Sequence, residues 1–194
     1  MDRPQLILDV GGVLLTNLSP FWEELAIHAN VPYEQLRSRY KQEMSKALWS
    51  GSVTEKEFWI WLCRHFPSID REHARSLLHK QLKPLPAMER LPDWSERSDI
   101  HILSNHRIEW ITPALKPIAK YVKSFTVSSE VGYFKPHSAI YAQAQKRLNG
   151  RHFVLFVDDQ KMNLRQAAQL GWKTLMADEA GKWIEDVTRM LKEQ

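Results

Sequence analysis

Residues 5–14, with the sequence QLILDVGGVL, constrain the fold of this chain more than any other segment. The apolar run from Leu6 to Leu8 is typical of a strand that is buried on both faces of a parallel sheet. Because Gly11 and Gly12 end this run, Asp9 is predicted to lie at the carboxyl end of the strand. Ligands bind at that edge of open α/β sheets, so Asp9 is a candidate either for chemistry or for capping a turn.

Polar side chains also end two later predicted strands. The apolar run IHIL finishes on Ser104 and Asn105, and the run FVLFV finishes on Asp158 and Asp159. Between them, the sequence GYFKP places Lys135 in a loop just before a predicted helix. The chain therefore presents Asp, Ser, Lys and Asp-Asp in this order, each at or after the end of a strand.

This series resembles the four motifs of the haloacid dehalogenase (HAD) superfamily, and the resemblance covers the whole chain. Each motif is weak alone, but four of them in order and at plausible spacing form a specific signal. The resemblance implies an α/β fold with a doubly wound, Rossmann-like parallel-sheet core.

The pattern of the second half independently favours the same architecture. It predicts helices at 108–115, 138–148 and 164–170, strands at 100–103, 124–127, 153–157 and 172–176, and a closing helix through 183–191. Strands that alternate regularly with helices favour a parallel, doubly wound sheet with right-handed crossovers.

The segment between the first two strands has helical apolar spacing instead. Ser19 is predicted to cap a first helix, residues 33–49 form a second, and Thr54 and Asp70 cap a third and a fourth. Prolines at 84, 86 and 92 then mark the return to the sheet. Most aromatic residues here are expected in the core, with one or two facing the cleft.

By resemblance, this segment is similar to the all-helical cap of one HAD subclass, which covers the active site and chooses the substrate. We therefore expect a core of residues 1–16 and 92–194 and a cap subdomain of residues 17–91.

The composition and charge of the chain indicate which kinds of binding partner to expect. Hydrophobic residues make up 43% and charged residues 26% of the 194 residues, which is typical of a globular domain, and no apolar run reaches membrane-spanning length. The net charge of +4 is spread without a basic block, and no zinc-finger or RNA-binding signature is present. We expect a small phosphorylated substrate and neither a nucleic-acid nor a membrane partner; the oligomeric state is left open.

The start of the chain and its cysteine content predict the cellular compartment. A short polar start leads directly into the first strand, without the pattern of a signal peptide, and Cys63 is the single cysteine. One cysteine allows no internal disulfide and suits a reducing environment. A cytoplasmic location is therefore expected.

The predicted strand ends suggest a chemistry. A carboxylate is ionised at neutral pH, so Asp9 can attack phosphorus without a base and form an aspartyl-phosphate that water later hydrolyses. Three clustered carboxylates, Asp9, Asp158 and Asp159, need a cation between them and suit Mg²⁺. By resemblance, the carbonyl of Gly11 is a further ligand, Asp159 is the first choice among the paired aspartates and Asp158 the second.

The resemblance also assigns a phosphate site. It implies that Lys135 offsets the charge on the nucleophile and the transferring group, and that the Ser104 hydroxyl donates to a phosphoryl oxygen. Asn105 and backbone amides after Asp9, such as that of Gly12, are expected to help. Asn163 falls where many relatives hold a supporting acid.

Gly11 departs from the usual phosphatase pattern, in which this position is an aspartate that protonates the leaving group. Losing such an acid costs about a hundredfold or more in rate. The glycine variant resembles the glucose-1-phosphate phosphatase-like branch, whose anomeric leaving group needs less protonation. The resemblance thus implies a Mg²⁺-dependent phosphatase acting on a small metabolite such as a sugar phosphate.

Two alternatives stay open. The second choice is a protein that binds a phosphoryl ligand or a partner without turning it over. The third is a 2-haloacid dehalogenase, which also lacks the second aspartate but works without metal and typically has an aromatic residue before Gly-Thr, where this chain has Val10-Gly11-Gly12.

Overall fold

The protein is built on a parallel sheet of five strands in the order β3-β2-β1-β4-β5, as seen in a computed structural model that describes residues 3–150 and 152–194. The strands are β1 (Gln5–Leu8), β2 (Asp99–Ser104), β3 (Val122–Val127), β4 (Val154–Asp158) and β5 (Lys173–Met176). The first strand of the chain lies at the centre, between β2 and β4. This order confirms the predicted doubly wound α/β core.

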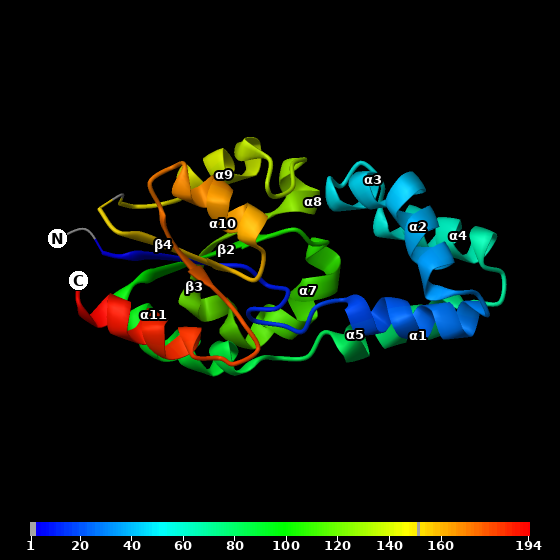
Figure 1. Cartoon of the computed structure of the whole chain (residues 1–194), viewed down its shortest axis with the longest axis horizontal. Coiled ribbons are helices and arrows are strands. Elements are labelled where there is room, and N and C mark those ends of the chain that lie inside the picture. Colours follow the sequence, from blue (N-terminus) through cyan, green and yellow to red (C-terminus); the bar gives the residue numbers. More distant parts are fainter. Residues whose placement is uncertain (1–2, 151) are drawn as a thin grey trace.

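Helices cover both faces of the sheet (Figure 1). One face carries α6 (Leu91–Arg97), α7 (Ile108–Leu115) and α11 (Trp183–Lys192), and the other carries α9 (Ser138–Gln145) and α10 (Lys161–Ala168). Leu6 and Leu8 pack into the first of these layers and Ile7 into the second. Because alternate residues of a strand point to opposite faces, an uninterrupted apolar strand requires both layers.

The long helical segment lies between β1 and β2 in the sequence, beyond the carboxyl ends of the strands (Figure 1). It contains α1 (Ser19–Ala29), α2 (Tyr33–Glu43), α3 (Ser45–Trp49), α4 (Glu55–His65) and α5 (Arg71–Gln81), and the 3-10 helix η1 (Pro86–Arg90) follows where the chain has returned to the sheet. The outgoing and returning chains are joined where Thr16 N donates to Lys83 O at 2.9 Å and Leu85 N donates to Leu14 O at 2.8 Å. The division into a core of 1–16 and 92–194 and a cap of 17–91 stays a proposal.

Local capping signals confirm two of the predicted helix starts. Thr54 Oγ1 accepts from Glu57 N at 3.2 Å while Glu57 Oε2 accepts from Thr54 N at 2.8 Å, so the two residues form a capping box. Asp70 Oδ1 accepts from His73 N at 2.7 Å. These signals succeed because donor and acceptor lie within one helical turn.

Two other predictions in this segment were wrong. Ser19 is the first residue of α1 and not its cap; Asn17 Oδ1 accepts the Ser19 N–H at 2.9 Å instead. The predicted helix 33–49 is interrupted at Met44, whose backbone (φ −127°, ψ −37°) separates α2 from α3.

The remaining differences between the predicted and the observed elements concern short helices. The return segment predicted from its prolines forms η1 and α6, each with proline in its first turn, because proline is compatible with a helix start. The short helices η2 (Lys116–Tyr121) and α8 (Ser128–Val131) were not predicted. Within the described ranges, no helix has the length and apolar content needed to cross a membrane.

Candidate active site

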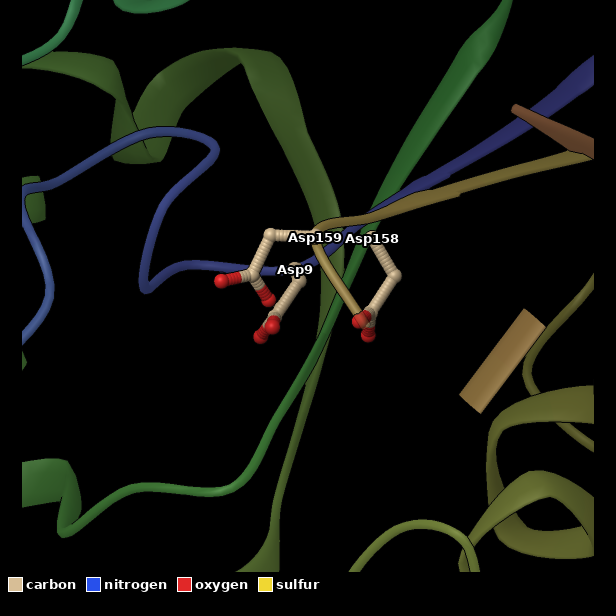
Figure 2. Close-up of side chains that lie close together, drawn as sticks. All are labelled: Asp9, Asp158 and Asp159. Atoms are coloured by element: carbon tan, nitrogen blue, oxygen red, sulfur yellow. The ribbon is translucent and has the colours of Figure 1, made fainter. Parts of the chain in front are cut away.

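Three carboxylates meet at the carboxyl edge of the sheet. Asp9 follows β1, Asp158 ends β4 and Asp159 comes next; one oxygen from each lies within 4.8 Å of the others. Figure 2 shows the three side chains, with the carboxylate of Asp158 set apart from the other two in this view. Neighbouring parallel strands bring the groups together because β1 pairs directly with β4.

Asp158 is completely buried and its oxygens are fully engaged. Its Oδ2 accepts from Lys135 Nζ at 2.5 Å, both oxygens accept from Asn163 Nδ2 at 2.9 and 3.0 Å, and Oδ1 also accepts from Gln160 N at 2.8 Å. Burial and the nearby charge of Asp9 raise the pKa of Asp158 to about 6, while Lys135 and Asn163 counter this rise. Asp158 is therefore placed to hold Lys135, and little of it is left for a metal ion.

Lys135 is a buried cation between two carboxylates. Its Nζ lies 2.9 Å from Asp9 Oδ1 as well as 2.5 Å from Asp158 Oδ2. Burial alone would lower the pKa of Lys135, but the charges of Asp9 and Asp158 outweigh it and the pKa is raised. The raised pKa keeps the Lys135 ammonium protonated at neutral pH, 2.9 Å from Asp9 Oδ1.

Asn105 fixes the backbone of Lys135. Its Oδ1 accepts from Lys135 N at 2.6 Å and its Nδ2 donates to Lys135 O at 2.8 Å. Both ends of the amide are used, so the side chain supports the lysine loop. A direct phosphate contact by Asn105 stays a prediction.

Several polar atoms at the site have no partner within residues 3–150 and 152–194. Asp9 Oδ1 accepts from Val10 N at 2.7 Å and contacts Lys135, whereas no hydrogen bond reaches Asp9 Oδ2. The buried Asp159 Oδ1 and Ser104 Oγ also lack partners. Burial, and then the charge of Asp158, raise the pKa of Asp159. Buried polar groups are normally satisfied, so Asp159 Oδ1 and Ser104 Oγ are available to a ligand at this site.

The donor set fits a hard divalent cation. Asp9 and Asp159, the two carboxylates with an oxygen that accepts no hydrogen bond from the described residues, offer the oxygen ligands that Mg²⁺ prefers, and a ligand role for the carbonyl of Gly11 stays a prediction. Burial is the main cause of the raised pKa of Asp159 and the charge of Asp158 adds to it, so a positive charge would stabilise this cluster of anions.

The two adjacent glycines serve different purposes. Gly12 has a φ of +74°, and a Cβ at this position would lie 2.6 Å from Asp159 Oδ2. Gly11 has no such φ, and a Cβ there would meet nothing within 4 Å. Only Gly12 is required by the backbone and by the close approach of Asp159.

Gly12→Ala is therefore expected to lower the free energy of unfolding by about 1–3 kcal/mol and to displace Asp159. Gly11→Ala, the matched control, is expected to change it by less than about 1 kcal/mol. Denaturant unfolding of both variants measures the difference. Equal destabilisation would contradict the assignment of Gly12 as the constrained position.

A cavity of about 240 Å³ lies over Asp9. It is lined by Asp9, Gly11, Asn17, Leu18, Trp49, Ser104, Asn105, His106, Lys135, Asp159, Gln160 and Asn163. Sequence reasoning did not select Asn17, Leu18, His106 or Gln160, and it expected Trp49 in the core. His106 directly follows Ser104 and Asn105, and Gln160 directly follows Asp158 and Asp159. This adjacency is the one sequence signal that could have identified them. Of the predicted residues, Gly12 and Asp158 do not line this cavity.

Comparison with solved structures decides the fold family. A predicted HAD-like family hydrolase from Porphyromonas gingivalis superposes with a TM-score of 0.81 over 100% of both chains, at 21% identity. This chain has the HAD fold. A HAD family enzyme from Bacteroides thetaiotaomicron in complex with magnesium and inorganic phosphate has a TM-score of 0.77, 19% identity, and coverage of 91% of this chain and 96% of its own.

Other proteins with the HAD fold carry out dehalogenation. The L-2-haloacid dehalogenase from Xanthobacter autotrophicus, with chloropropionic acid covalently bound, has a TM-score of 0.64 at 16% identity and covers 91% of this chain and 77% of its own. No protein-family model and no curated protein matches the sequence. At these sequence identities the similarity shows the fold and not the activity.

Proposed function

We propose that this protein is a HAD-fold phosphatase that hydrolyses a small phosphorylated metabolite through an aspartyl-phosphate on Asp9. The observation that carries the proposal is the Asp9 carboxylate, which is held at one oxygen by Lys135 and Val10 and has its other oxygen free beside a cavity. The Bacteroides thetaiotaomicron enzyme, with magnesium and phosphate bound, supports the same ligands here.

Asp9 performs the first step. A carboxylate oxygen of Asp9 forms a bond to phosphorus as the bond between phosphorus and the leaving oxygen breaks, and the electron pair stays on that oxygen. Lys135 orients the carboxylate while it offsets negative charge on the phosphoryl group. The unpartnered hydroxyl of Ser104 is available to donate to a phosphoryl oxygen. Water then hydrolyses the aspartyl-phosphate and restores Asp9.

Mg²⁺ would be held by Asp9, Asp159 and the carbonyl of Gly11, where it would supply positive charge to the phosphoryl oxygens. Asp158, whose oxygens are taken by Lys135, Asn163 and the Gln160 amide, is proposed to orient the lysine.

A sugar phosphate is the proposed substrate class. With glycine at position 11 there is no carboxylic acid to protonate the departing oxygen, so leaving groups that are already acidic, such as an anomeric hydroxyl, are favoured. The cavity of about 240 Å³ over Asp9 shares Asn17, Asp159 and Gln160 with a neighbouring cavity of about 950 Å³, so a leaving group has room beyond the phosphoryl site.

The deciding experiment measures release of inorganic phosphate from p-nitrophenyl phosphate and a panel of sugar phosphates, with Mg²⁺ and with excess chelator. Metal-dependent release supports the proposal. Halide release from 2-haloacids in chelator would support the dehalogenase alternative, and phosphate binding without turnover of any substrate would support the binding-protein alternative.

Gly11→Asp tests the missing acid. We expect the substitution to accelerate the first chemical step with primary alkyl phosphates by up to about 100-fold, and with aryl or anomeric phosphates much less. The fold should tolerate it because a Cβ at Gly11 meets nothing within 4 Å. Single-turnover rates over a leaving-group series make the measurement, with Gly11→Ala as control. A stable variant that changes every substrate by the same factor would disprove this role for position 11.

A further inference from the structure

His106 is a buried residue that lines the same cavity as the proposed nucleophile. It follows Ser104 and Asn105 and is 4% exposed. Its Nδ1 has no hydrogen-bond partner in the part of the chain that the structure describes. The proposed mechanism gives this residue no role, although a buried polar side chain with an unpaired atom is unusual.

A hydrogen bond holds the backbone of His106, and aromatic packing holds its ring. Ser128 Oγ accepts from His106 N at 3.1 Å, which holds the backbone. The ring packs edge-on against Trp49 of α3 and Trp110 of α7, with centroids 5.6 and 6.0 Å apart. Trp49 also lines the cavity, so an aromatic wall and an imidazole face the same space.

The neighbouring Arg107 anchors the chain around Trp49 to this loop. Its Nη1 donates to Val53 O at 2.5 Å and contacts Leu48 O at 3.5 Å. Glu109 pairs with the same guanidinium through Nη2 at 2.5 Å. These contacts hold the end of α3 beside His106, so the wall of the cavity is built in advance of ligand binding.

The imidazole is uncharged at neutral pH. Burial, reinforced by the nearby Lys135 ammonium and opposed by the Arg107 backbone, lowers the pKa of His106 to about 4. A neutral imidazole carries one N–H donor and one acceptor, so His106 can hydrogen-bond an oxygen without presenting a charge.

The other residues that line the cavity bear on the charge that a substrate can carry. Among the described residues, Lys135 is the one lysine or arginine that lines the cavity, and it is already shared by Asp9 and Asp158. Besides Asp9, Asp159 and His106, the polar lining residues are uncharged: the hydroxyl of Ser104 and the amides of Asn17, Asn105, Gln160 and Asn163. The described lining of this cavity therefore offers no further cation for a second anionic group on the substrate.

We propose that His106 contacts the leaving group, donating a hydrogen bond from its neutral N–H to the oxygen that departs from phosphorus, and that with Trp49 it selects an uncharged, hydroxyl-bearing leaving group. This inference rests on the proposed phosphatase function. As the phosphorus–oxygen bond breaks, the departing oxygen keeps the electron pair, is stabilised by the N–H of His106, and takes its proton from water. The imidazole keeps its own proton throughout and partly replaces the acid that Gly11 lacks.

The test compares His106→Leu, which removes the donor, with His106→Asn, which retains an N–H donor. In single-turnover assays with Mg²⁺, His106→Leu is expected to slow primary alkyl phosphates by about 10- to 100-fold and anomeric or aryl phosphates, including p-nitrophenyl phosphate, by no more than about 3-fold. His106→Asn is expected to recover part of the loss. His79→Leu, on the exposed face of α5, is the control for a surface histidine.

A double variant separates chemistry from packing. If His106 and an aspartate at position 11 serve the same oxygen, His106→Leu should cost much less in the Gly11→Asp background than in the wild type. A merely structural role would give the same loss in both backgrounds and on every substrate, and that result would overturn the inference. So would unchanged rates in His106→Leu.

The charge selectivity is tested with sugar monophosphates and the corresponding bisphosphates. We expect kcat/KM to be at least about 10-fold lower for the bisphosphates. Equal values would overturn the selection of an uncharged leaving group. If the wild type hydrolyses p-nitrophenyl phosphate in these assays, the proposed function stands whatever the His106 variants show; if it hydrolyses no phosphate ester, both proposals fail.

Discussion

Asp9→Asn is expected to abolish phosphate-ester hydrolysis, with kcat reduced on the order of 10⁴-fold or more, as for removal of other enzyme nucleophiles. The amide is neither a nucleophile toward phosphorus nor an anionic ligand for a metal ion. The surrounding geometry is expected to persist, because Val10 N and Lys135 Nζ can still donate to the amide oxygen at position 9. Phosphate release with Mg²⁺ present makes the measurement.

The same variant should not lose stability. Asp9→Asn removes one of three carboxylates that lie within 4.8 Å of one another, and Lys135 keeps its 2.5 Å contact with Asp158. In chelator the melting temperature is therefore expected to equal or exceed that of the wild type. Asp93→Asn, at an exposed position of α6, is the control. A folded Asp9→Asn protein that retains phosphatase activity would remove Asp9 from the mechanism.

Removal of the metal ion is expected to have the second-largest effect. Chelation of the wild type should lower activity by about 10³-fold, and added Mg²⁺ should restore it, because several kcal/mol of charge stabilisation would be lost. Asp159→Ala is expected to show a comparable loss that Mg²⁺ does not restore. Asp159 is expected to be a metal ligand because its Oδ1 is buried and has no hydrogen-bond partner within the described ranges.

A binding measurement makes this prediction independent of turnover. Mg²⁺ should raise the melting temperature of the wild type and leave that of Asp159→Ala nearly unchanged, since ligand binding stabilises the state that binds. Glu179→Ala, an exposed acid in the loop before α11, should behave as the wild type does. Full activity in excess chelator would favour metal-free dehalogenase chemistry.

Local sequence signals predicted the strands that are buried on both faces and the helices that begin with a side-chain cap. The apolar runs identified β1, β2 and β4, and Thr54 and Asp70 marked the starts of α4 and α5. The break at Met44 was missed because the apolar spacing continues through it. Helix spacing does not reveal where the chain must turn to pack against other helices.

The sequence by itself determined the order of the chemical groups and the edge of the sheet that carries Asp9, Ser104, Asp158 and Asp159, because strand ends can be read from apolar runs. Only the tertiary structure decided how their hydrogen bonds are shared: Asp158 is taken up by Lys135 and Asn163, whereas Asp159 keeps a free oxygen. It also distinguished Gly12 from Gly11 and brought Trp49 to His106. These outcomes depend on burial and on close approaches between distant segments, which spacing along the chain does not encode.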